Sequence, residues 1–359
     1  MSRIRTRLAS RPRLLASLAG TLAVTAVAAC GSNQPVKLAA SASPSAAAKS
    51  ASAAPTPPPP PPPTPKPTIV AGATYAAPAI VQVENLNAAR PQSGLSSADV
   101  VYEYSAEGGI SRFSAIYFSD PKGQVGPVRS ARLISPVLIR QYGGVLIYSG
   151  SSGYVYSRMG TWGTPRFDET SAGADMFRIS SRGAPHNLYT DGGRVGDLVR
   201  KSARPAVPYT LWSRTASPAG GVPVSGFTVP VSPSEQPSWG WNAGAGGWQR
   251  TEADTGVFID ADNGKPVTVP TVIVMEVPAN LNKDDIEDGC CTPGWEYFLN
   301  GSGPAQVFTG GQGYTVTWSA TEFGGPPQFT LPGGAAAPIA PGAVWIEVVP
   351  TGNTAATRG

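Results

Sequence analysis

Four short polar segments carry most of the side chains that could bind a ligand or transfer a proton. In chain order they are NAARPQSGLSSADVVYE at 87–103, EGGISRF at 107–113, GPVRSAR at 126–132 and SSRGAPHNLYT at 180–190. They combine guanidinium groups, carboxylates, an imidazole and hydroxyl groups, which are the donors and acceptors of anion sites and of acid–base catalysis. Three kinds of chemistry are therefore open: anion binding, acid–base catalysis and structural ion pairing.

The arginines of these segments are the first candidates for a binding site. Arg129 and Arg132 are three residues apart at the expected start of a helix, which would place them on one helix face beside free backbone N–H groups. The same arginines would serve equally well as partners of Asp99, Glu103 and Glu107 in buried ion pairs, so both interpretations stay open. We favour a groove for an anionic ligand, lined by Arg112, Arg129, Arg132, Arg182, His186 and Asn187.

A catalytic interpretation depends on His186, the only histidine in the chain. A lone histidine in a loop is more often a hydrogen-bonded structural residue than a general base. Glu103 and Glu107 could supply the pair of carboxylates that glycan hydrolysis requires. The sequence SGSSG at 149–153 lacks the flanks of a serine nucleophile elbow. Enzymatic activity is therefore undecided at this level.

Cys290 and Cys291 are adjacent in EDGCCTPGW, and a vicinal disulfide, two free thiols and a redox or metal site are all open. Adjacent Cα atoms are about 3.8 Å apart, whereas disulfides prefer about 5.5 Å. With one histidine and no second cysteine pair, a zinc site is disfavoured and we favour a structural role. DADNG at 260–264 predicts a hairpin turn and not a calcium loop. We expect neither a metal nor a cofactor.

The N-terminus predicts a lipoprotein signal peptide over residues 1–29. Five arginines precede residue 14, and Leu14 to Ala29 is a short apolar stretch of small residues. Such a stretch is typical of a secretory signal, since a spanning helix needs about 20 apolar residues. Cys30 follows two alanines, as in a bacterial lipobox, and would become the lipidated (palmitate-bearing) first residue. This predicts a protein anchored to the extracytoplasmic face of the cell membrane.

Removing the signal changes the charge balance and the class of partner. The chain has 27 basic and 23 acidic residues, and five of the basic ones precede Cys30, which leaves 22 against 23. A sustained basic surface, which nucleic-acid binding requires, is therefore excluded. Residues 75–214 carry 15 basic and 10 acidic residues, and residues 215–359 carry 4 and 13. A purely structural protein with two oppositely charged domains that dock is a third hypothesis.

Composition and periodicity predict an α+β protein. Residues 30–74, rich in Pro, Ala and Ser, predict a disordered spacer, with polyproline conformation at Pro57–Pro63. We expect a mixed α/β domain at 75–214, a mostly β domain at 215–350 and a disordered tail at 351–359. The expected strands are 79–84, 100–105, 113–118, 145–149, 267–277, 314–319 and 344–349. The expected helices are 131–142, interrupted at Pro136, and 193–203.

The four polar segments, in this order and spacing, resemble those of the YerB-like bacterial lipoproteins, a two-part family catalogued as domain of unknown function 3048. GSGPAQVF and PGAVWIEVVP, near the end of the chain, resemble its C-terminal part, and the similarity covers roughly residues 78–350. The resemblance implies an envelope lipoprotein without an established biochemical role. This chain lacks the family's Asn-His before AARPQ and the histidine of its HxGGS-like turn, where Tyr148–Ser152 stands. A mechanism that needs two histidines is therefore in doubt.

These observations support two main functional hypotheses. The first is a lipid-anchored, non-catalytic envelope protein whose groove binds an anionic cell-wall component or a partner protein. The second is an envelope hydrolase or transferase that acts on glycan or phosphodiester bonds, with His186 and Glu103 or Glu107 as acid and base. The second hypothesis requires His186 and a carboxylate to share an open cleft with Arg129.

Overall fold

A computed structural model describes residues 73–217 and 219–359 of the chain. The predicted signal peptide, Cys30 and the spacer up to residue 72 lie outside the described residues. Within the described residues, no helix is long and apolar enough to span a membrane. The described part is α+β, with helices concentrated before residue 203 and almost only strands after residue 222, which confirms the predicted fold class.

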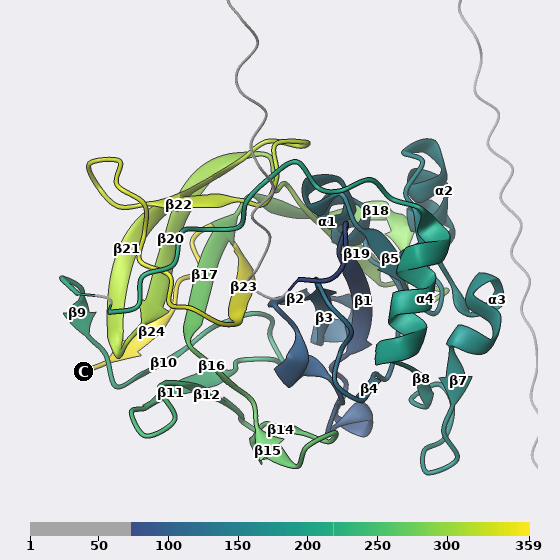
Figure 1. Cartoon of the computed structure of the whole chain (residues 1–359), viewed down its shortest axis with the longest axis horizontal. Helices are drawn as coiled ribbons and strands as arrows, with labels where there is room; N and C mark the ends of the chain where they lie inside the picture. Colours follow the sequence, from purple (N-terminus) through teal and green to yellow (C-terminus); the bar gives the residue numbers. More distant parts are fainter. Residues whose placement is uncertain (1–72, 218) are drawn as a thin grey trace, which may run out of the picture. The chain divides into compact units, whose positions relative to one another are not determined.

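One large sheet forms the centre of this part (Figure 1). Its strand order is β22-β21-β20-β17-β23-β2-β3-β1-β5-β6, and β9 pairs with β21. The central contact is parallel, with Val100–Tyr104 of β2 beside Val344–Val348 of β23. The strands are β1 (Ala79–Glu84), β2 (Val100–Ser105), β3 (Ser111–Tyr117), β5 (Val145–Ile147), β6 (Arg166–Phe167), β9 (Val222–Pro223), β17 (Thr271–Val277), β20 (Gly301–Thr309), β21 (Gln312–Ala320), β22 (Gln328–Thr330) and β23 (Val344–Pro350).

The predicted segments 75–214 and 215–350 therefore contribute strands to the same sheet. In space, β2 of the first segment hydrogen-bonds to β23 of the second. β1, β2 and β3 are buried along their whole length, because helices or strands cover both faces of the sheet. This explains their continuous apolar runs, which are typical of strands without a solvent face.

A second sheet packs near the large one and has the order β13-β12-β11-β10-β24, with β16 beside β12. The expectation of a disordered tail at 351–359 is corrected in part, because Ala356–Arg358 form β24, which pairs with β10. The strands of this sheet are β10 (Gly226–Thr228), β11 (Ser238–Asn242), β12 (Gly247–Glu252), β13 (Gly256–Val257), β16 (Thr268–Val269) and β24 (Ala356–Arg358).

Smaller ribbons connect these sheets. The predicted hairpin at DADNG is confirmed as the turn between β14 and β15, where Asp260 pairs with Lys265. The remaining strands are β4 (Gln124–Val125), β7 (Phe177–Arg178), β8 (Leu188–Asp191), β14 (Ile259–Asp260), β15 (Lys265–Pro266), β18 (Ala279–Ile286) and β19 (Pro293–Tyr297). Short 3₁₀ turns are η1 (Asn87–Ala89), η2 (Leu95–Ser97), η3 (Glu107–Gly109) and η4 (Gly173–Asp175).

Helix α1 covers one face of the large sheet, and α4 together with the second sheet covers the other. Ile80 and Tyr102 pack with α1, whereas Val81 and Val101 belong to the core shared with α4 and the second sheet. The helices are α1 (Ile134–Tyr142), α2 (Gly153–Thr161), α3 (Glu169–Ala172) and α4 (Gly192–Ser202). The expected interruption at Pro136 is wrong, because α1 begins at Ile134. Pro136 therefore lies in the first turn, where a missing N–H breaks no helical hydrogen bond.

Candidate functional site

The strands β1 and β3 and the segment GPVRSAR bring the polar segments together. Glu84 at the end of β1 is opposite Arg112 on β3, and Val83 bridges Val128. The backbone of 127–129 is thus extended along β1, with Arg129 donating its N–H to the carbonyl of Gln82 at 2.9 Å. The expected helix start at Arg129 and Arg132 is therefore wrong.

The two arginines contact different carboxylates and do not share a helix face, because both precede α1, which begins at Ile134. Arg129 reaches Glu84, and Arg132 reaches Glu107 and Glu287. The predicted arginine set is therefore divided between two neighbouring clusters.

The first cluster is built on the carboxylate of Glu84, which is completely buried. Arg129 Nε lies 3.0 Å from Glu84 Oε1, and His186 Nδ1 lies 2.9 Å from Glu84 Oε2. The side chains of Arg129 and His186 keep 24% and 21% of their surface exposed, so both reach solvent. One buried carboxylate therefore orients a partly exposed guanidinium and a partly exposed imidazole.

Arg182 lies in the same loop as His186, and its contacts are of a different kind. Its Nη2 donates to the carbonyl of Pro91 at 2.6 Å, and its Nη1 donates to the carbonyl of Ala89. Among the ion pairs of the described residues none includes Arg182. Backbone carbonyls hold this guanidinium in place without neutralising its charge.

Asn187, the last residue of the predicted set, turns away from this cluster. Its Oδ1 accepts from Arg178 Nη1 at 2.7 Å, and its Nδ2 donates to the carbonyl of Ile179 at 3.2 Å. Asn187 therefore stabilises the loop between β7 and β8, which carries Arg182 and His186.

The second cluster is an ion-pair network around Glu107. Arg112 Nη2 donates to Glu107 Oε1 at 3.0 Å, and Arg132 Nε donates to Glu107 Oε2 at 2.8 Å. Arg132 also contacts Glu287, which lies just after β18. Arg112 is fully buried and Arg132 almost so, which removes both from contact with solvent. Arg112 and Arg132 therefore form buried ion pairs, which is the second of the two interpretations left open by the sequence.

The two carboxyl groups of this cluster have opposite pKa shifts. Burial opposes the ionisation of Glu107, but the charges of Arg112 and Arg132 outweigh it and lower its pKa. Burial raises the pKa of Glu287 to about 9, and the nearby charges of Glu107 and Asp285 add to the rise despite Arg132. These shifts favour the ionised form of Glu107 and the protonated form of Glu287, because two guanidinium groups act on Glu107 whereas burial dominates at Glu287.

Glu103 belongs to a third group of charges, deep in the protein. Its carboxylate accepts from Ser111 Oγ at 2.6 Å and from Arg250 Nη2 at 2.7 and 2.8 Å, and it is completely buried. Glu103 and Glu107, the expected carboxylate pair, thus bind different arginines, and neither contacts His186 through a hydrogen bond or ion pair that the described residues contain.

Sequence reasoning missed Glu84, Asp285 and Glu287, and it gave Arg90 no role. Arg90 Nη2 donates to Glu235 at 2.8 and 2.9 Å and its Nη1 to Asp254 at 2.7 Å, which ties the AARPQ loop to the second sheet. A signal for Glu84 was present, since a carboxylate at the end of an apolar strand run needs a buried partner. Nothing in the sequence pairs Glu287 with an arginine 155 positions earlier.

Comparisons with known proteins agree with this architecture. Residues 64–205 match the N-terminal domain model of the DUF3048 proteins of unknown function, and residues 227–346 match the C-terminal domain model. The "Putative lipoprotein YerB" of Bacillus subtilis (strain 168) is 27% identical over 281 residues, or 76% of this chain and 81% of that protein. The crystal structure of the YerB protein from Bacillus subtilis has a TM-score of 0.64 at 25% identity, covering 77% of this chain and 92% of that one. These matches confirm the resemblance carried by the four polar segments, and the chain belongs to the DUF3048 family of YerB-like proteins.

Proposed function

We propose that this protein is a lipid-anchored envelope protein that binds an anionic cell-wall polymer through Arg129, Arg182 and His186, here named the cationic patch. The membrane anchor would be Cys30, on the extracytoplasmic face. The lipoprotein description of the Bacillus subtilis relative supports the anchor, and the sequence of the first 30 residues is of the matching type. The proposed function requires no nucleic acid, metal or cofactor.

The charge of the cationic patch carries the proposal. Glu84 neutralises one guanidinium, that of Arg129, whereas Arg182 is held by two carbonyl oxygens. Apart from the imidazole of His186, the patch therefore keeps one uncompensated positive charge at partly exposed side chains. A guanidinium fixed in this way matches the geometry of phosphate and carboxylate groups, which accept two parallel N–H bonds.

The buried clusters have a supporting role in this proposal. Arg112 and Arg132 share the carboxylate of Glu107 and lie beneath the surface. They hold η3 and the segment 127–132 against β1 and β3, and this segment carries Arg129. The rigid support reduces the entropy that a long arginine side chain and its loop would lose on binding.

Binding to purified cell wall tests the proposal. The full chain with Cys30→Ser, which cannot be acylated, is mixed with wall preparations that either retain or have lost their anionic polymer. Arg182→Gln should weaken binding about tenfold, which corresponds to the loss of one charge-assisted hydrogen bond of about 1.4 kcal/mol. Arg200→Gln is the matched control, since it removes the same charge from an exposed arginine on α4 that pairs with Asp197.

The outcomes of this experiment are distinct. Equal weakening by Arg182→Gln and Arg200→Gln would show a non-specific charge effect and would contradict the proposed patch. Binding that survives removal of the anionic polymer would contradict a polymer ligand and favour an envelope protein as the partner. Membrane fractionation of the Cys30→Ser chain checks the anchor separately, and retention in the membrane would refute it.

The second candidate function is that of a hydrolase or transferase acting on glycan or phosphodiester bonds. The observation that favours it is the hydrogen bond between His186 Nδ1 and Glu84 Oε2, which fixes the imidazole and leaves Nε2 for a substrate. Glu84, not Glu103, is then the positioning carboxylate. The measurement is release of soluble fragments from cell wall by the full chain and by His186→Gln. Equal release by both proteins would exclude the enzyme.

A further inference from the structure

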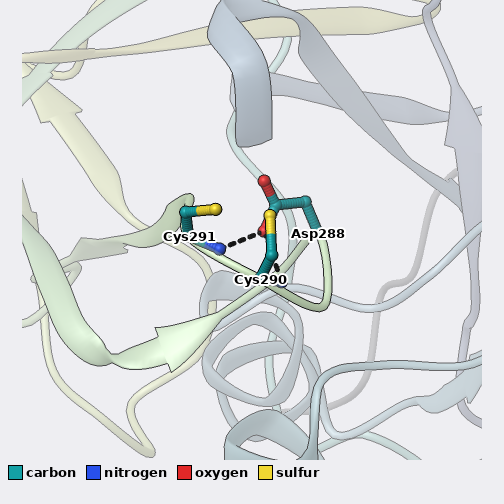
Figure 2. Close-up of side chains that lie close together, drawn as sticks. All are labelled: Asp288, Cys290 and Cys291. Carbon is teal, nitrogen blue, oxygen red and sulfur yellow. Dashed lines mark hydrogen bonds between the residues drawn. The ribbon is translucent and has the colours of Figure 1, made fainter. Parts of the chain in front are cut away.

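The tip of the β18–β19 hairpin carries a group of metal-binding side chains far in sequence from the polar segments. Asp288, Cys290 and Cys291 are exposed, and one ligand atom from each lies within 4.8 Å of the others. Figure 2 shows both sulfur atoms on the side of the loop where the Asp288 carboxylate lies. The cysteines are free thiols in this structure. Two sulfur donors and one oxygen donor therefore face a common volume.

The carboxylate of Asp288 also organises the loop that carries the thiols. Asp288 Oδ1 accepts the N–H groups of Cys290, Cys291 and Thr292 at 3.0, 2.8 and 3.0 Å, and Oδ2 accepts the hydroxyl of Thr292. A carboxylate oxygen has two lone pairs, so Oδ2 keeps one for a further ligand. The Asp288 side chain, which closes the turn, thus also offers a ligand oxygen beside the two thiols.

Three contacts fix the hairpin on the rest of the protein. Ser152 donates to the buried carboxylate of Asp285, Arg158 pairs with Glu296, and Arg132 contacts Glu287. Because Glu287 directly precedes Asp288, the loop is held beside the second cluster. The loop that carries the ligand atoms is therefore held in place, which lowers the conformational entropy lost when these atoms are arranged around an ion.

We propose that Asp288, Cys290 and Cys291 bind a thiophilic divalent cation, Zn²⁺, with the two thiolates and one carboxylate oxygen as ligands and a water molecule in the fourth position. Zn–S bonds of about 2.3 Å and Zn–O bonds of about 2.0–2.2 Å in a tetrahedron place the donor atoms less than 4.8 Å apart. Each thiol loses its proton on binding, so one Zn²⁺ replaces two protons. Neither sulfur is oxidised.

A disulfide is the main competitor for the same sulfur atoms. Its usual Cα–Cα separation is 4.4–6.8 Å, whereas Cα atoms across one trans peptide are about 3.8 Å apart. A bond between neighbours is therefore strained and easily reduced. Metal binding needs no such approach, because the ion lies between the sulfur atoms.

Cadmium titration of the full chain tests the proposal directly. Cys30→Ser removes the only other cysteine, so every thiolate signal comes from the hairpin tip. The protein is reduced with a phosphine, its thiols are counted with a thiol reagent, and Cd²⁺ is added while the sulfur-to-cadmium charge-transfer absorbance is recorded. We expect two thiols, saturation at one equivalent of Cd²⁺, and loss of the band when Zn²⁺ is added in excess.

Variants assign the ligands. Replacing both cysteines with serine should abolish the band, and Asp288→Asn, which keeps an oxygen acceptor for the loop, should weaken binding about tenfold or more. Asp284→Asn is the matched control, an exposed carboxylate on the same hairpin, and should bind as the parent does. A band that does not saturate at one equivalent, thiols that stay unreactive after reduction, or equal affinity of Asp288→Asn and Asp284→Asn would each overturn the proposed site.

Discussion

Replacing Arg250 should damage the fold more than replacing any other arginine discussed above. Its guanidinium is completely buried, and it binds Glu103 at 2.7 and 2.8 Å and also contacts Glu252. Its carbon atom lies 4.4–5.4 Å from the ring centres of Phe113, Phe258 and Trp345. The side chain thus joins β12 of the second sheet to β2 and β3 of the large sheet.

The size of the effect follows from burial. Arg250→Met leaves Glu103 and Glu252 without their main counter-ion, and removal of one partner of a buried ion pair costs about 3–5 kcal/mol. Glu103→Gln should cost a similar amount, because Arg250 then loses one of its two carboxylates. The double variant removes both charges together, which is often close to neutral. Its cost should therefore fall at least about 1.5 kcal/mol below the sum of the single effects.

Urea unfolding of the full chain with Cys30→Ser measures these free energies. The buried Trp239 and Trp345, with ring centres 5.4 Å apart, report on this region by their fluorescence. Arg200→Met, which removes an exposed arginine paired with Asp197, should leave the unfolding midpoint unchanged. Additive single effects, or an Arg250→Met cost below about 1 kcal/mol, would refute the counter-ion argument. Either result would also reopen the question of whether Glu103 acts in catalysis.

Two further predictions concern pH dependence and backbone conformation. Because the folded-state pKa of Glu287 is raised to about 9 by burial, the native state keeps this proton where the unfolded chain has lost it. Stability should fall as pH rises from about 4.3 toward that value, and Glu287→Gln should flatten this part of the profile in urea unfolding; parallel profiles would contradict the pKa shift. Gly94→Ala should destabilise by about 1–3 kcal/mol, since φ is +90° and a Cβ atom would lie 2.6 Å from the carbonyl oxygen of Gln124. Gly108→Ala, at φ +64° with open space, carries the backbone strain alone, so equal melting temperatures for the two variants would exclude a steric contribution at Gly94.

Much of the fold could be predicted from local pattern. The runs at 79–84 and 100–105 match β1 and β2 to the residue, and DADNG forms the predicted hairpin turn. These segments have strong apolar or turn character, which the tertiary environment does not override. The helix α2 was missed, because its sequence GYVYSRMGT lacks a clear apolar period and its cap, Ser152, lies in a Gly-Ser loop.

The site was predicted only in part. The four polar segments do meet, but Arg129 and Arg132 contact different carboxylates, because the chain pairs with β1 before α1 begins. A helical reading of the same residues placed them on one face. Helix α1 begins a few residues later than expected, and this shift determines which carboxylate each of the two arginines contacts.

The amino-acid sequence by itself determined the family, the α+β class, the order of the polar segments and the lipoprotein-type N-terminus. The tertiary structure decided which charged groups lie together: Glu84 with Arg129, Glu107 with Arg112 and Arg132, and Glu103 with Arg250. The physical reason is that carboxylates are chemically alike and their pairing depends on burial and register. Burial and strand register are fixed only when β23, near the end of the chain, pairs with β2, from its N-terminal half.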